Sequence, residues 1–106
     1  MATQVKDGDG RSTRWDEHRE ARRAELVAAA QATTARYGKV HILVNNAGVG
    51  GGGWTDASWN WTMGVNLMAT IWGIEIFWRL IDQHGEGGHI VSTASIAGLI
   101  SGSNYP

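Results

Sequence analysis

Two short stretches of this 106-residue sequence carry side chains that could take part in chemistry. The first is the amide pair Asn45-Asn46, which follows an apolar run that begins at Val40. The second extends from Ser92 to Ser95, where hydroxyl and small side chains follow a second apolar run. Amides and hydroxyls both donate and accept hydrogen bonds, so these groups suit the binding of a small polar ligand. We expect them to form one site only if the fold brings the two stretches together.

The two apolar runs are predicted to be strands of a parallel sheet. Neither run alternates apolar with polar residues, so both faces of each strand should be covered by helices. A right-handed crossover through one helix would place the strands side by side and pointing the same way. Their carboxyl ends, at Asn45-Asn46 and at 92–95, would then share the edge where open α/β sheets bind ligands.

The connecting helix is predicted between Ser58 and Gln83, where apolar residues recur at steps of three and four. Thr55, Asp56 and Ser58 are candidate N-caps, and Gly85 should follow the end of the helix. The predicted buried stripe of this helix consists of Trp59, Met63, Leu67, Thr70, Ile71, Ile74, Phe77, Trp78 and Ile81. Three large apolar residues fall outside it, namely Trp61, Trp72 and Ile76.

A further helix is predicted from Thr13 to Tyr37, ended by Gly38. One face of it carries Leu26, Ala30, Thr33 and Tyr37. Residues 1–12 are predicted to be a loose lead-in, and residues 13–106 a single partial domain.

Three motifs now support a family resemblance. Three stretches of the sequence resemble the central motifs of the short-chain dehydrogenase/reductase family. They are Asn45-Asn46-Ala47-Gly48, Val65-Asn66-Leu67, and the run from His89 to Ser95 followed by Ala97-Gly98. The order and spacing match over roughly Leu26 to Pro106, and three linked motifs are more specific than any one alone. The resemblance implies an α/β fold, namely part of a Rossmann-like doubly wound parallel sheet in the order helix, strand, long helix, strand.

The resemblance also implies a fragment of an NAD(P)-dependent oxidoreductase. Such an enzyme transfers hydride between nicotinamide and an alcohol or carbonyl substrate, with NAD or NADP as cofactor. Family domains have about 250 residues, so we expect this chain to lack the N-terminal Gly-x-x-x-Gly-x-Gly turn and the C-terminal Tyr-x-x-x-Lys pair. Tyr105 lies too close to Ser95 to be that tyrosine and is interpreted as a loop residue. We therefore expect the chain to be inactive alone.

By the same resemblance, Asn66 is a catalytic asparagine that holds a proton-relay water, and Ser95 is a catalytic serine that hydrogen-bonds the substrate oxygen. Ser95 and Trp54 would contact substrate. Cofactor contacts are expected from Asn45, Asn46, Ala47, Gly48, Thr93 and Ala94. Structural roles remain open: amides can satisfy backbone groups at a strand end, Asn66 can bend its helix, and Ser95 can act as a cap.

The glycine run from Gly48 to Gly53 matches Gly-x-Gly-x-x-Gly in letters. Five glycines in six positions match almost any glycine pattern, and no acidic residue ends a second strand at the distance that the dinucleotide motif requires. A flexible loop is favoured, and a nucleotide-binding loop remains the weaker alternative.

Composition restricts the remaining functions. The net charge is −1 and acidic residues interleave with Arg19, Arg22 and Arg23, which disfavours nucleic acid as a partner. No cysteine is present, and no apolar run reads as a membrane span, which fits a cytoplasmic protein. We expect no metal site, because no acid or thiol completes a set with the histidines His41, His84 and His89.

Two kinds of protein partner are considered for the 58–83 helix. In the family this helix commonly contributes to a dimer interface, so a homo-oligomer is expected. The alternative to an enzyme fragment is a non-catalytic remnant that docks on a full-length homologue through the same helix.

Overall fold

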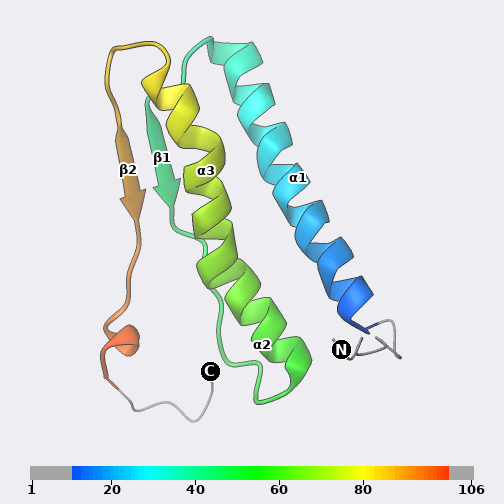
Figure 1. The fold of residues 1–106 in the computed structure, drawn as a ribbon. Helices are drawn as coiled ribbons and strands as arrows, with labels where there is room; N and C mark the ends of the chain where they lie inside the picture. Colours follow the sequence, from blue (N-terminus) through cyan, green and yellow to red (C-terminus); the bar gives the residue numbers. More distant parts are fainter. Residues whose placement is uncertain (1–10, 101–106) are drawn as a thin grey trace, which may run out of the picture.

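The structure is a computed structural model that describes residues 11–100, with the side chains of residues 11–13 excepted. Two parallel strands and two long helical segments form the fold (Figure 1). In chain order the elements are α1 (Arg11–Tyr37), β1 (Ile42–Asn45), α2 (Asp56–Met63), the π-helical turn η1 (Gly64–Met68), α3 (Ala69–Asp82), β2 (His89–Ser92) and the 3-10 turn η2 (Ile96–Gly98).

The predicted parallel strand pair is confirmed. β1 pairs with β2 in a register that joins Ile42 to His89 and Asn45 to Ser92. The crossover between them runs through α2, η1 and α3, so the strand-helix-strand order also agrees with the sequence. The fold is therefore α/β and corresponds to part of a Rossmann-like sheet.

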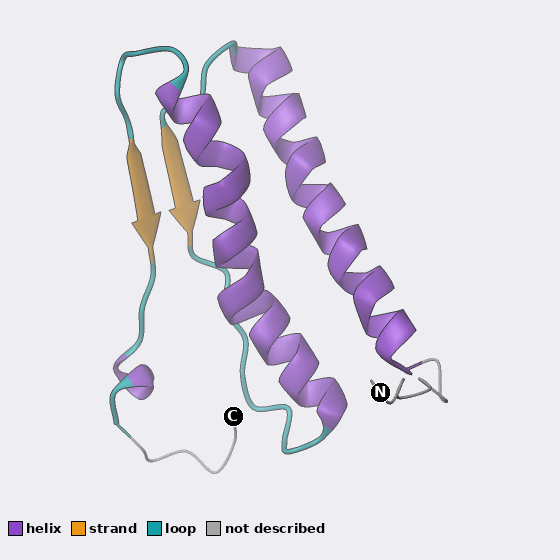
Figure 2. Ribbon diagram, in the orientation of Figure 1, coloured by secondary structure: helices purple, strands orange, loops and turns teal. Residues whose placement is uncertain are grey.

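Coverage of both sheet faces was expected, and this expectation is wrong for the described residues. α1 and α3 lie on the same side of the strands (Figure 2). Leu43 and Asn45 point toward the helices and are half-buried, whereas Ile42 and Val44 on the opposite face are 59% and 58% exposed. The strands are continuously apolar as in a two-sided sheet, but residues 11–100 supply helices to one side only.

The long helix is continuous from Asp56 to Asp82 but contains a π-helical turn in its middle. Of the three candidate caps, Thr55 is the one used: its side-chain oxygen accepts a hydrogen bond from the backbone N–H of Ser58. Gly85 follows the helix with φ +72°, a conformation that glycine adopts without strain. No helix within residues 11–100 combines the length and apolar content needed to cross a membrane.

The prediction of which face of this helix is buried is largely wrong. Phe77 and Ile81 are buried as predicted, and so is Trp72, which was placed outside the stripe. Six stripe residues are instead exposed, with exposed fractions between 38% and 46%: Trp59, Met63, Leu67, Ile71, Ile74 and Trp78. Apolar residues surround much of this helix, so periodicity alone did not determine which face packs on the sheet.

The core lies between the C-terminal halves of α1 and α3 and the start of β1. Its buried members are Ala30, Val40, Phe77 and Ile81, with Leu43, Ile76 and Leu80 packed against them. Ala30 was predicted on the inner face of α1, and it is 4% exposed. Tyr37 was predicted there too, but it is 72% exposed because α1 ends at this residue.

Candidate functional site

The carboxyl ends of β1 and β2 bring the two chemically interesting stretches together, as expected. The Asn45 Nδ2 donates to Ser92 Oγ at 3.3 Å, and the Thr93 hydroxyl donates to Asn46 Oδ1 at 2.7 Å. The backbone N–H of Thr93 also donates to the Asn45 carbonyl at 2.9 Å. These bonds use one polar atom of each side-chain amide, so both asparagines have a structural role in addition to any ligand contact.

A close helix–strand contact lies directly behind Asn45. A Cβ atom added to Gly73 of α3 would lie 2.6 Å from Asn45 Oδ1. Only a residue without a side chain therefore fits there with Asn45 in its present position. Gly73 thus sets the position of an amide at the edge of the candidate site.

Asn66 lies in the π-helical turn. The turn is marked by the backbone N–H of Ala69, which donates to the carbonyl of Gly64 five residues earlier. The Asn66 amide pairs twice with the backbone of Val49: its Oδ1 accepts from the Val49 N–H and its Nδ2 donates to the Val49 carbonyl, both at 2.8 Å. Asn66 is exposed, and its amide is satisfied by the loop after β1. π-helical turns often occur at functional sites.

Ser95 follows β2 and begins the turn η2. Its Oγ accepts a hydrogen bond from the Ala97 N–H at 3.1 Å, which makes it an N-cap. Ser95 is exposed, and accepting this bond leaves its hydroxyl hydrogen available as a donor. No hydrogen bond joins Ser95 to Asn66 in the described part of the chain.

The other predicted ligand contacts are small or exposed. Ala47, Gly48, Thr93 and Ala94 are all exposed at this edge of the sheet. Trp54 is 66% exposed, and its ring lies 5.8 Å from that of Trp59.

The glycine loop does not resemble a pyrophosphate cradle. The following helix, α2, has Asp56 in its first turn. A carboxylate at that position favours the helix dipole but would repel a phosphate. The loop is instead anchored at Val49 by Asn66.

A cleft of about 490 Å³ between α1 and the long helix was not anticipated from the sequence. Ala47 lies at its border, and Arg19 of α1 donates across it to Asn60 Oδ1 at 3.3 Å. Much of the lining is apolar, and it includes Trp15, Leu26, Trp61, Val65 and Trp72. Figure 1 shows that α1 and the long helix diverge toward this end. Trp61 and Trp72 lie outside the predicted stripe, and they were the residues in the sequence that could have indicated this cleft.

At the opposite edge of the sheet, an acidic side chain lies beside two of the histidines that the sequence left without one. Glu86 does complete a set with His41 and His84: one ligand atom from each lies within 4.8 Å of the others. The hydrogen bond from Lys39, and then that from His41, lowers the pKa of Glu86 to about 2. Glu86 lies in the turn before β2, and only the parallel pairing brings it beside the start of β1.

Comparison with known proteins agrees with this geometry. The family described as short chain dehydrogenase matches residues 12–106. A short-chain dehydrogenase/reductase from Burkholderia phymatum, solved in complex with NAD, is 43% identical with a TM-score of 0.72, and the match covers 76% of this chain and 30% of that one. A metagenomic short-chain oxidoreductase in complex with NADP is 31% identical with a TM-score of 0.69, over 77% of this chain and 39% of that one.

A curated relative gives the same result at the level of sequence. A diacetyl reductase of the (S)-acetoin-forming type from Staphylococcus aureus is 31% identical over 81 residues, which is 73% of this chain and 31% of the relative. The chain thus spans about a third of the length of these relatives. With the family match, the parallel strand pair and the three motifs in register, the chain belongs to the short-chain dehydrogenase/reductase family.

Proposed function

We propose that this chain provides the central strand-helix-strand part of an NAD(P)-dependent oxidoreductase that acts on an alcohol or a carbonyl compound. The observation that carries the proposal is the joining of the Asn45-Asn46 pair to Ser92 and Thr93 at the carboxyl edge of the sheet. Asn66 is attached to the loop that leaves this same edge. Open α/β sheets bind ligands at this edge.

The cofactor is NAD or NADP. When bound, it supplies a nicotinamide that gives or accepts hydride. Ala47, Gly48 and Ala94 carry small or no side chains, so backbone at the edge is accessible to a large planar ligand. Gly48 has only the Asn66 Oδ1 near the position of a Cβ, at 3.7 Å. We assign cofactor contacts to these residues together with Asn45, Asn46 and Thr93.

Ser95 orients the substrate by donating its free hydroxyl hydrogen to the carbonyl or alcohol oxygen, while its Oγ is held by the Ala97 N–H. It acts as a hydrogen-bond donor and not as a nucleophile. Asn66 holds the loop at Val49 and positions a water for proton transfer. Trp54 forms an exposed aromatic wall of the substrate cleft.

The proton donor comes from outside these motifs. Neither the Tyr-x-x-x-Lys pair nor the Gly-x-x-x-Gly-x-Gly turn of the family occurs within the 106 residues. We therefore expect no turnover by this chain alone, and oxidation of NADH or NADPH by the purified chain with a carbonyl substrate would contradict that expectation. A cytoplasmic location, which the absence of cysteine supports, is part of the same proposal.

A chimera tests the assigned roles. Residues 42–98 would replace the matching segment of the Staphylococcus aureus diacetyl reductase, and reduction of diacetyl would be followed through NAD(P)H absorbance. We expect an active chimera that loses about 100-fold in kcat on Ser95→Ala, the magnitude typical for loss of one positioned donor. Ser92→Ala is the matched control and should change kcat by only a few-fold. Equal losses for the two variants would count against a catalytic role for Ser95.

A second candidate function is docking on a protein partner through the 58–83 helix. The apolar row Trp59, Met63 and Leu67, continued by Ile74 and Trp78, is exposed on this helix. A homo-oligomer of the family type or a complex with a full-length homologue would cover this row. Size-exclusion chromatography with and without such a homologue separates the functions, because an unpartnered chain should show no shift.

A further inference from the structure

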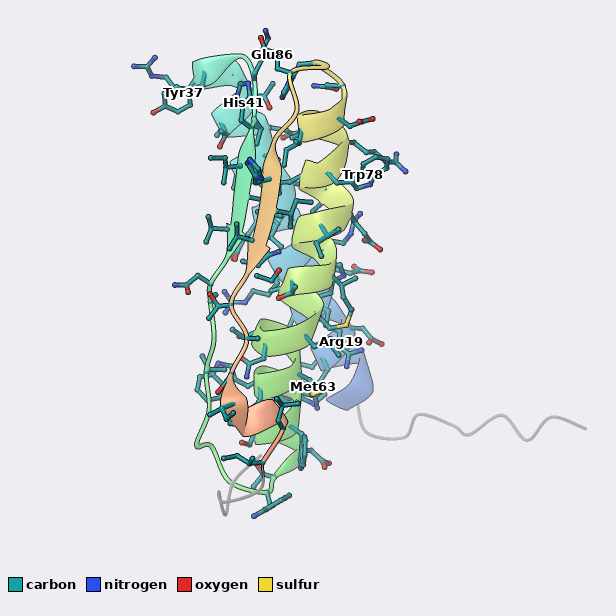
Figure 3. All side chains as sticks on the ribbon, turned by 90° about the vertical axis from the view of Figure 1, so that its left-hand side faces the viewer. Arg19, Tyr37, His41, Met63, Trp78 and Glu86 are labelled. Atoms are coloured by element: carbon teal, nitrogen blue, oxygen red, sulfur yellow. The ribbon has the colours of Figure 1, made fainter. Side chains whose placement is uncertain are left out.

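The edge of the sheet opposite the candidate active site carries a compact group of three metal-ligating side chains. His41 immediately precedes β1, and His84 and Glu86 lie in the connection between α3 and β2. Figure 3 shows the His41 and Glu86 side chains close together at this end of the molecule. The His41 Nε2 lies 2.7 Å from Glu86 Oε2, and the His84 Nδ1 lies 3.7 Å from the same oxygen.

Backbone groups fix the orientation of the His84 ring. Its side chain is only 5% exposed, and its Nε2 lies 2.7 Å from the carbonyl oxygen of Val40. A carbonyl only accepts hydrogen bonds, so Nε2 must carry the hydrogen. The Glu86 N–H donates to Nδ1 at 3.2 Å, which requires a lone pair on that nitrogen. Both ring nitrogens of His84 are therefore held by backbone groups, and Nδ1 faces Glu86.

This arrangement is the one that metal-binding histidines use. A ligating imidazole typically donates its other N–H to a backbone carbonyl, which fixes the tautomer and the ring orientation. The carbonyl of Val40, a buried core residue, does this for His84. The His41 ring lies beside it, tilted by 43° with ring centroids 4.4 Å apart, and both rings contact Glu86 Oε2.

We propose that His41 Nε2, His84 Nδ1 and the Glu86 carboxylate form a binding site for a divalent transition-metal cation of the Zn²⁺ type. Two imidazoles and a carboxylate are a donor set that zinc accepts, with water as the fourth ligand. Bonds of about 2.1 Å in a tetrahedral site place ligand atoms about 3.4 Å apart. The observed separations of 2.7 and 3.7 Å bracket this value.

Binding requires small changes in these exposed loops. His41 would shift its hydrogen to Nδ1 and exchange its contact with Glu86 for the metal. The Glu86 backbone N–H would also have to give up its hydrogen bond to His84 Nδ1, because this nitrogen has a single lone pair. Lys39 competes for the Glu86 carboxylate, since the Lys39 Nζ lies 2.7 Å from Glu86 Oε1. The cation would clamp the connections that precede β1 and β2, so the site is structural and independent of the proposed oxidoreductase chemistry.

The test uses the full 106-residue chain without an affinity tag, stripped of metal and titrated with ZnCl₂ in a calorimeter. We expect one saturable site and a rise in the thermal unfolding midpoint with zinc, as ligand binding to the folded state requires. His41→Gln and Glu86→Gln should each weaken binding at least 10-fold. The matched controls His89→Gln and His18→Gln should leave it unchanged, and CaCl₂ should give no binding.

Two further variants sharpen the test. His84→Gln should also abolish binding, with circular dichroism to check folding because this side chain is buried; if the variant fails to fold, His41→Gln and Glu86→Gln decide. Lys39→Met removes the competing cation and should tighten binding, whereas a simple ion-pair cluster predicts no such gain. Absence of saturable zinc binding, or undiminished binding by Glu86→Gln and His41→Gln, would overturn the proposal.

Discussion

At the scale of single residues, Asn66 has the most informative environment. Its side chain makes two hydrogen bonds to the backbone of one residue, Val49, across 17 positions of sequence. This pairing attaches the long helix to the loop that leaves β1. The amide that makes this pairing lies within the π-helical turn.

Replacement of Asn66 by Leu should therefore release the loop. Leucine has similar volume but forms neither bond, and we expect a loss of about 1 to 3 kcal/mol in the free energy of unfolding. The Val49 amide should lose its protection in hydrogen-exchange NMR. Thr70→Val serves as a control one turn later, since its hydroxyl makes only a long 3.5 Å bond to the Asn66 carbonyl. Unchanged protection of Val49 would show that Asn66 does not hold the loop.

Glu86 gives a prediction about acid stability. Hydrogen bonds from Lys39 and His41 lower its pKa from 4.5 to about 2 in the folded chain. A lowered pKa means that the folded state prefers the carboxylate, so the stabilisation is complete above pH 4.5 and is lost as the pH falls toward 2.

We compare the urea midpoints of the natural chain and Glu86→Gln, both measured in EDTA. Their difference should be constant from pH 7 to about 4.5 and should shrink toward pH 2. Glu25→Gln is the control, because its pairing with Arg22 at 3.3 Å is exposed and local to one helix. A difference between Glu86→Gln and the natural chain that is as large at pH 2 as at pH 5 would contradict this origin of the pKa shift.

At the scale of elements, the long helix contains two glycines with opposite surroundings. Gly73 faces Asn45 at the sheet, whereas a Cβ atom at Gly64 would meet nothing within 4 Å. Both are helical, so the intrinsic gain on changing either to alanine is similar, up to about 1 kcal/mol.

Gly64→Ala should consequently raise the free energy of unfolding, and Gly73→Ala should lower it. The alanine at 73 displaces the Asn45 side chain and breaks its bond to Ser92. Urea unfolding of both variants provides the measurement. If Gly73→Ala were as stabilising as Gly64→Ala, the close approach of α3 to β1 would be wrong.

At the scale of the whole molecule, the long helix and the sheet each bury one side and expose the other. Phe77 is buried in the core, whereas its neighbour Trp78 is 46% exposed. The sheet likewise buries one face and leaves Ile42 and Val44 exposed. These exposed apolar surfaces are the ones that a partner would cover.

Paired substitutions test this arrangement. Phe77→Ala should cost about 3 kcal/mol or more, because it leaves a cavity between α1, α3 and β1. Trp78→Ala should change stability by about 0.5 kcal/mol or less in the monomer, as is usual for exposed positions. Chemical denaturation at low protein concentration measures both, and a larger cost for Trp78→Ala would support the helix phase predicted from sequence instead.

The sequence by itself determined the order of elements, the parallel pairing and the edge where Asn45, Asn46 and Thr93 gather. These follow from local signals: apolar runs that do not alternate, the Thr55 cap, the stops at Gly38 and Gly85, and motifs in register. Such signals act within a few residues, so they can be recognised without knowledge of the packing.

Only the tertiary structure decided which helix face is buried, how Asn66 is satisfied and which acid joins His41 and His84. Apolar residues occur around most of the long helix, so its phase depends on contacts with α1 and the strands. Asn66 with Val49, and His41 with Glu86, are far apart in sequence. Their contacts exist because the parallel crossover brings together the loops at each edge of the sheet, a consequence of the whole chain path that no local pattern encodes.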